Sequence, residues 1–170
     1  MTQRQPTLIF DCIPALKTLL AATTFPPLLG TGMGQLNKNG VLVALGILVN
    51  EPNRETIAVT GIVDDNDQST WPEKGLNSKG ETFTTELIVV TNVPKRSAEE
   101  AWARLQVIVQ TIDAALRDMT TGRPIVPIAI ATLGVYSWYV SSVRTALYPG
   151  DVDGSFVASA GVSITVKSQH

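Results

Sequence analysis

The feature that most constrains the fold is one long amphipathic segment, SAEEAWARLQVIVQTIDAALRDM, at 97–119. Ser97 with Glu100 three residues later is the pattern of a capping box, and Gly122 and Pro124 supply the stop. Large apolar residues recur at helical spacing and predict one buried stripe: Trp102, Leu105, Val109, Ile112 and Leu116. The polar residues expected to face away are Arg104, Gln106, Asp113 and Arg117. Burying the stripe is worth on the order of 10 kcal/mol before entropy, so the helix is expected to lie across a sheet.

Two alternating segments predict strands for that sheet. In GETFTTELIVV, at 80–90, one face takes Phe83, Thr85, Leu87 and Val89, and the other takes Thr84, Glu86, Ile88 and Val90. The closing run at 155–167, SFVASAGVSITVK, alternates over its whole length. Its inward positions are expected to be Phe156, Ala158, Ala160, Val162, Ile164 and Val166.

Two further runs come earlier in the chain. The segment VLVALGILV at 41–49 is apolar on both faces. This predicts either a central strand, or a strand with a helix on one face and a neighbouring subunit on the other. The run ETIAVTGIV at 55–63 alternates, and the turn-like NEPNR between the two predicts an antiparallel hairpin.

The remaining elements complete an α+β plan. Asp11 can cap a short N-terminal helix over 11–23 that Pro26 and Pro27 end. The run at 128–148 is predicted to be a strand with a bulge or kink at Ser141–Ser142, and its alanine-rich start is alternatively a loop or short helix. We therefore expect a mostly antiparallel sheet with one long helix packed on a face, in a single domain spanning 1–170.

Composition narrows the class of function. Charged residues make up 16% of the chain and its formal net charge is −2, which predicts no sequence-specific nucleic-acid binding. The lone Cys12 and the lack of a signal peptide or long apolar run predict a soluble intracellular protein with no membrane contact. The only histidine, His170, is the last residue, so a Cys–His catalytic pair is not expected.

The polar stretch DDNDQSTWPEKGLNSKG, at 64–80, is predicted to be a mobile or functional loop because it is long for a compact domain. Its aspartates lack the offsets of a calcium loop, and the glycines at 30, 32 and 34 lack those of a phosphate loop. We therefore expect no metal, no cofactor and no catalytic residue. The candidate interface residues are Asp64, Asp65, Asp67, Trp71, Glu73, Lys74 and Glu86.

The order of these elements resembles the tail terminator proteins of long-tailed (siphovirus-type) bacteriophages. The likeness lies in IFDCIPALKTLLAAT, in GETFTTELIVV followed by the helix at 97–119, and in the closing GSFVASAGVSITVKS. It implies a non-enzymatic virion subunit that forms a hexameric ring on the tail tube, stops tube polymerisation and presents the surface that docks to the head.

The resemblance also implies partners and a location. The partners would be other copies of the chain, the tail tube protein and a head-completion (stopper) protein, with DNA passing through the ring. The protein would be found at the head–tail junction of the virion, and in the host cytoplasm during assembly. The alternatives are another phage neck or tail component, such as a head-completion or tube protein, and a small enzyme using Glu86 with the aspartates at 64–67.

Overall fold

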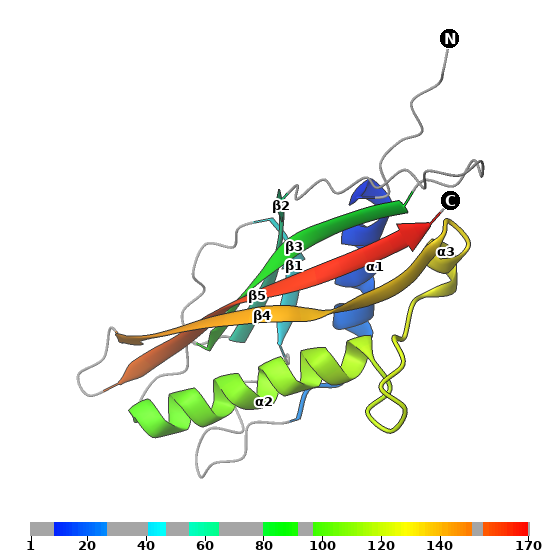
Figure 1. Ribbon diagram of the computed structural model, residues 1–170. Coiled ribbons are helices and arrows are strands. Elements are labelled where there is room, and N and C mark those ends of the chain that lie inside the picture. The colour runs from blue at the N-terminus through cyan, green and yellow to red at the C-terminus, as the bar shows by residue number, and fades with distance from the viewer. Residues whose placement is uncertain are drawn as a thin grey trace.

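The computed structural model describes residues 9–26, 41–46, 55–64, 80–91, 97–150 and 155–169. Five strands form one sheet in the order β1-β2-β3-β5-β4 (Figure 1). The architecture is α+β, as the sequence predicts. Along the chain the elements are α1 (Ile9–Ala22), β1 (Leu42–Leu45), β2 (Glu55–Asp64), β3 (Gly80–Thr91), α2 (Ala98–Leu116), α3 (Ile128–Ala131), β4 (Val135–Pro149) and β5 (Phe156–Gln169).

The pairing of β1 and β2 corrects the predicted hairpin. The two strands run parallel, with Leu42 beside Thr56 and Leu45 beside Val59, whereas all other pairs in the sheet are antiparallel. The nine residues at 46–54 can span roughly 30 Å when extended, which is enough to return the chain to the start of a four-residue strand. Because β1 lies at the edge of the sheet, the prediction of a central strand for 41–49 is wrong.

One face of the sheet carries the core. The inward residues predicted for β3 and β5 are buried on this face, apart from the half-buried Phe156, and so are Ile57 and Val59 of β2. Cys12, Leu16 and Leu20 of α1 pack into the same cluster. Figure 1 shows α2 running beside β4 and β5 and α1 lying behind the strands. The long helix therefore covers the sheet as its amphipathic pattern predicts.

The capping box of α2 is confirmed. The Ser97 hydroxyl accepts a hydrogen bond from the Glu100 backbone N–H at 3.2 Å, and the Glu100 carboxylate accepts one from the Ser97 N–H at 2.9 Å. The buried stripe is rotated from the predicted one, because Trp102 is 46% exposed and Val109 is only half-buried. The buried positions of the helix are Ala101, Arg104, Leu105, Ile108, Ile112 and Leu116.

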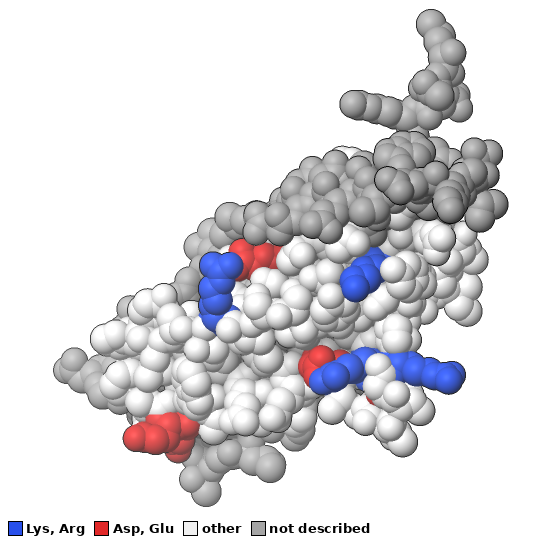
Figure 2. Space-filling model, viewed as in Figure 1, with Lys and Arg blue, Asp and Glu red and all other residues white. Residues whose placement is uncertain are grey.

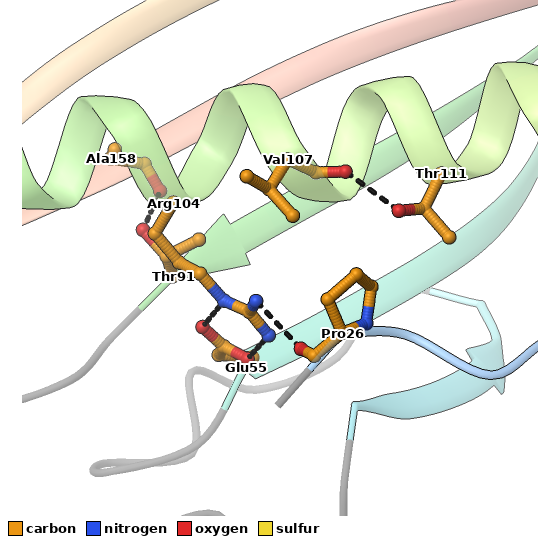
Figure 3. A network of polar contacts seen from close by, with 7 residues as sticks. All are labelled: Pro26, Glu55, Thr91, Arg104, Val107, Thr111 and Ala158. Carbon is orange, nitrogen blue, oxygen red and sulfur yellow. Dashed lines mark hydrogen bonds and ion pairs between the residues drawn. The ribbon is translucent and has the colours of Figure 1, made fainter. Parts of the chain in front are cut away.

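The burial of Arg104 is the main departure from the predicted helix face. Its guanidinium donates to both carboxylate oxygens of Glu55, each at 2.6 Å, and to the carbonyl of Pro26 at 2.8 Å (Figure 3). The exposed fractions of Arg104 and Glu55 are 6% and 0%. A bidentate arginine–carboxylate pair can lie in a core only when its remaining donors are also satisfied. This ion pair ties α2 to the start of β2 and to the chain that follows α1.

The helix ends earlier than the predicted stop. Leu116 is its last residue, and Arg117 is already extended, pairing as an isolated bridge with Pro124. The intervening turn is held by Asp118, whose side chain accepts from the backbone of Thr120 and Thr121. These hydrogen bonds lower the pKa of Asp118 below its ordinary value. Gly122 has a positive φ of 68° and serves this turn rather than the helix cap.

The alanine-rich start of the run at 128–148 forms a short helix, which is one of the alternatives that the sequence left open. Residues 128–131 form α3, and β4 begins at Val135. Register shifts occur between Val135 and Ser137 and between Val140 and Ser142, so the bulge expected at Ser141–Ser142 is confirmed and a second one precedes it. Tyr136 lies at the first bulge and is 57% exposed, whereas Trp138, two positions later, is buried.

Thr85 on the core face of β3 provides a test of the packing. Its hydroxyl is buried and has no hydrogen-bond partner in the described structure. A buried hydroxyl without a partner costs free energy that an isosteric methyl group does not. We therefore expect Thr85→Val to raise the free energy of unfolding by about 1 kcal/mol in urea denaturation.

The matched control for this substitution is Thr84→Val on the opposite face, where the Thr84 hydroxyl lies 3.0 Å from that of Thr165. This control is expected to give no gain in stability. A destabilised Thr85→Val variant would mean that the hydroxyl is satisfied in solution.

Candidate interaction surface

Most of the candidate interface residues fall outside the described structure. Asp65, Asp67, Trp71, Glu73 and Lys74 belong to residues 65–79, which the structure does not describe. Asp64 is the last residue of β2, and its side chain is not described either. The predicted role of the loop at 64–80 therefore stays a prediction, and Glu86 is the only member of the set whose surroundings can be examined.

Glu86 lies on the sheet face away from the core helices. It pairs with Ser163 of β5 and is half-buried. A Cβ added to Gly161 would lie 2.7 Å from the Glu86 Oε1 atom, so the carboxylate rests directly over this glycine. The space that Gly161 leaves on this face is therefore taken by the side chain of Glu86.

The same face holds hydroxyl and aromatic side chains from β4 and β5. The Ser142 hydroxyl donates to that of Ser163 at 2.9 Å, and the Lys167 ammonium lies 5.6 Å from the centre of the Tyr139 ring. A cation at this distance from an aromatic face is held by the ring quadrupole. Figure 2 shows that charged side chains on the viewed side of the molecule are few and that some of opposite sign lie next to one another. The described part of this face therefore combines hydroxyl and aromatic side chains with a few charged ones.

Of the twelve exposed large apolar side chains among the described residues, five lie on β4, more than on any other element. Between residues 141 and 149 every residue is exposed except Ala146, which is half-buried. The exposed large apolar side chains of this strand are Tyr136, Tyr139, Val143, Leu147 and Tyr148. Isolated exposed apolar residues are normal, but a series along one strand is typical of a protein–protein contact. We define the β4 edge surface as these five residues.

An open apolar hollow of about 550 Å³ lies between α1 and α3. Its lining includes Pro14, Leu19, Ile130 and Leu133, and Asp11 is the one charged residue among those that line it. Such a hollow can receive an apolar side chain. It lacks the convergent polar groups by which a small-molecule site fixes a ligand.

Within the ranges that the structure describes, no three histidine, cysteine, aspartate or glutamate side chains gather into a group able to hold a metal ion. No described helix is long and apolar enough to cross a bilayer. Cys12 of α1 is buried in the core cluster.

Sequence reasoning missed both Arg104 and the β4 edge surface. Arg104 could have been recognised because it shares a helical face with Ala101, Leu105 and Ile108, at spacings of three and four. The aromatic run VYSWYV was recognised as strand, but which of its side chains are exposed depends on two bulges. Comparison with known proteins supplies no further guide, since no protein-family model and no curated protein matches the chain.

Proposed function

We propose that this protein is a structural subunit of a phage virion, similar to the tail terminators. In this proposal it closes into a hexameric ring on the end of the tail tube, stops tube polymerisation and presents the head-docking surface. The observation that carries the proposal is the β4 edge surface, an exposed apolar series along one strand that lies outside the described core cluster.

Two further features support it. The order of helices and strands on which the resemblance rests is the order of the structure, with only the short α3 added. A ring of identical copies uses heterologous contacts, in which each subunit offers two different surfaces to its neighbours. The described subunit has two such surfaces at opposite ends of its sheet, the edge at β1 and the edge at β4.

The proposed partners follow from position in the particle. One side of the ring would contact the tail tube protein and the other a head-completion protein, with the DNA passing through the opening. The contacts would form during assembly in the host cytoplasm and persist at the head–tail junction. The proposal gives the protein no catalytic role and no cofactor.

The experiment is native mass spectrometry and negative-stain electron microscopy of the purified protein, alone and mixed with tail tubes. We expect a species of six times the 18.2 kDa chain mass, seen as rings, and rings bound at one end of the tubes. Tube subunits added afterwards should fail to elongate that end, whereas untreated tubes should grow. A ring of another size that binds heads instead of tubes would point to a different neck component. A protein that stays monomeric at all concentrations and does not bind tail tubes would refute the proposal.

A further inference from the structure

The sheet has two outer edges, formed by β1 and by β4. Within the described residues no strand lies beyond either of them. Natural edge strands are protected from pairing by charges, prolines, bulges or short length. The part of β4 that follows its second bulge, Ser142–Tyr148, has an unbroken register with β5 and carries a single charge, Arg144. This part of the edge is therefore unusually open to pairing with another strand.

The two edges run in opposite directions, and this follows from the pairing alone. β1 is parallel to β2, and β2 is antiparallel to β3. β3 is antiparallel to β5, which in turn is antiparallel to β4. Hence β4 runs opposite to β1. When copies are related by rotation about an axis along the strands, β4 of one copy meets β1 of the next as an antiparallel pair.

The backbone groups that β4 offers to a partner can be identified. The Gly150 N–H donates to the Ser155 carbonyl, so this residue of the hairpin directs its backbone toward β5. The direction of the backbone hydrogen bonds alternates along an antiparallel strand. Between the second bulge and Gly150, the odd-numbered residues therefore direct their backbone N–H and C=O groups away from β5. Val143, Thr145 and Leu147 therefore hold the free N–H and C=O groups, and all three are exposed.

The same reasoning applies to β1. The Gly46 N–H donates to the Val59 carbonyl of β2, so the alternate residues Val41, Val43 and Leu45 direct their backbone groups outward. Leu45 is 52% exposed. Each edge thus presents three outward residues over a five-residue stretch, Val41–Leu45 on one and Val143–Leu147 on the other.

We propose that the ring of the preceding section closes by edge-to-edge strand pairing, in which β4 of one copy pairs antiparallel with β1 of the next. The register places Val143 opposite Leu45, Thr145 opposite Val43 and Leu147 opposite Val41. The six sheets then form one continuous cylinder of strands, with α1 and α2 of every copy on the same side. The inference rests on the proposed function only for the closure into a ring.

A second copy of the chain is the occupant that the observations favour. It brings an edge of matching length and opposite direction, and β1 adds no charge to the single Arg144 of β4. The side chain of Arg144 lies on the other face of the sheet from Val143 and Leu147, since its partner Gly161 alternates with the buried Ala160 and Val162. On the face of Val143 and Leu147, paired edges would therefore bury no charge, whereas Arg144 shares the opposite face with Tyr139 and Tyr148. A stable interface buries roughly 800 Å² on each partner, and Leu147, Tyr148 and Tyr139 are positioned to add area beside the strands.

The test is Thr145→Pro, because proline removes an outward N–H while leaving the bonds to β5 intact. We expect a folded monomer by circular dichroism and native mass spectrometry, with complete loss of rings. Thr145→Ala, which keeps the N–H, should still form rings. Ala146→Pro, which removes an N–H facing β5, should instead destabilise the fold. A Thr145→Pro protein that forms rings as the native chain does would overturn the inference.

Disulfide cross-linking provides a test that does not depend on how the proline variant folds. Residues of a hydrogen-bonded pair lie about 5.5 Å apart at Cα, within disulfide range. The double variant Val43→Cys/Thr145→Cys should give a ladder of covalent oligomers up to six chains, and a mixture of the two single variants should give dimers only. The buried Cys12 should contribute no cross-link.

The outcomes separate this inference from the proposed function. Rings without cross-links would overturn the strand pairing and leave the ring intact. Covalent dimers from Thr145→Cys alone would indicate a symmetric β4–β4 contact and would also overturn it. An open-ended ladder without six-membered rings would retain the strand pairing and count against the tail-terminator role.

Discussion

Replacing Arg104 with methionine is expected to lower the free energy of unfolding by about 3–5 kcal/mol. The substitution removes both guanidinium hydrogen bonds from the Glu55 carboxylate, which is fully buried. Removing only the arginine is costly because the carboxylate charge stays buried without its counter-ion. Urea denaturation followed by circular dichroism measures the loss.

The same helix offers a matched control. Arg117 pairs with Asp113 four residues earlier, and the arginine side chain is 44% exposed. Exposed pairs at this spacing are worth roughly 0.3–0.5 kcal/mol, so Arg117→Met should change stability by no more than that. The double variant Glu55→Leu/Arg104→Met should recover most of the loss, since both charges are then absent. If Arg104→Met costs as little as Arg117→Met, the ion pair is not buried in solution.

Leu105→Asp is expected to abolish cooperative folding. Leu105 is 2% exposed and lies in the middle of α2, where the helix packs on the sheet. The change removes an apolar side chain, at about 2–5 kcal/mol for leucine truncation, and adds a buried charge with no partner. Together these exceed the margin of a domain whose total stability is about 5–15 kcal/mol. Size-exclusion chromatography and thermal melts should show an aggregated or unfolded chain.

The control for this variant is the neighbouring position, Gln106→Asp, which is exposed and should stay folded. Leu105→Ala should unfold cooperatively at lower denaturant, which would separate loss of packing from burial of charge. A soluble Leu105→Asp protein with a normal melting transition would mean that α2 presents another face to the sheet.

The predicted experiments separate folding from assembly. The Arg104 and Leu105 variants act through the core face of the sheet, whereas the Thr145 variants act at an exposed residue of the β4 edge. A chain that folds normally but fails to assemble therefore locates the interface on the β4 edge. A chain that fails to fold says nothing about that edge.

Several parts of the structure follow from local sequence. The capping box at Ser97, the alternation of β3 and β5 and the N-terminal helix depend on neighbouring residues in the chain. Backbone hydrogen bonds and the periodicities of helix and strand are local properties, so these elements could be predicted together with the α+β class. The predicted order of elements is confirmed for the same reason.

The arrangement of those elements depended on contacts between distant residues. Arg104 is buried because Glu55, 49 positions earlier, lies beside it. The parallel course of β1 and the exposure of Tyr136 depend on strand register. The apolar pattern at 41–49 indicates only that both faces of this strand avoid water. It does not say whether they are buried by the same chain or by another. Sequence periodicity reports which residues avoid water, whereas the identity of their partners is decided by tertiary packing.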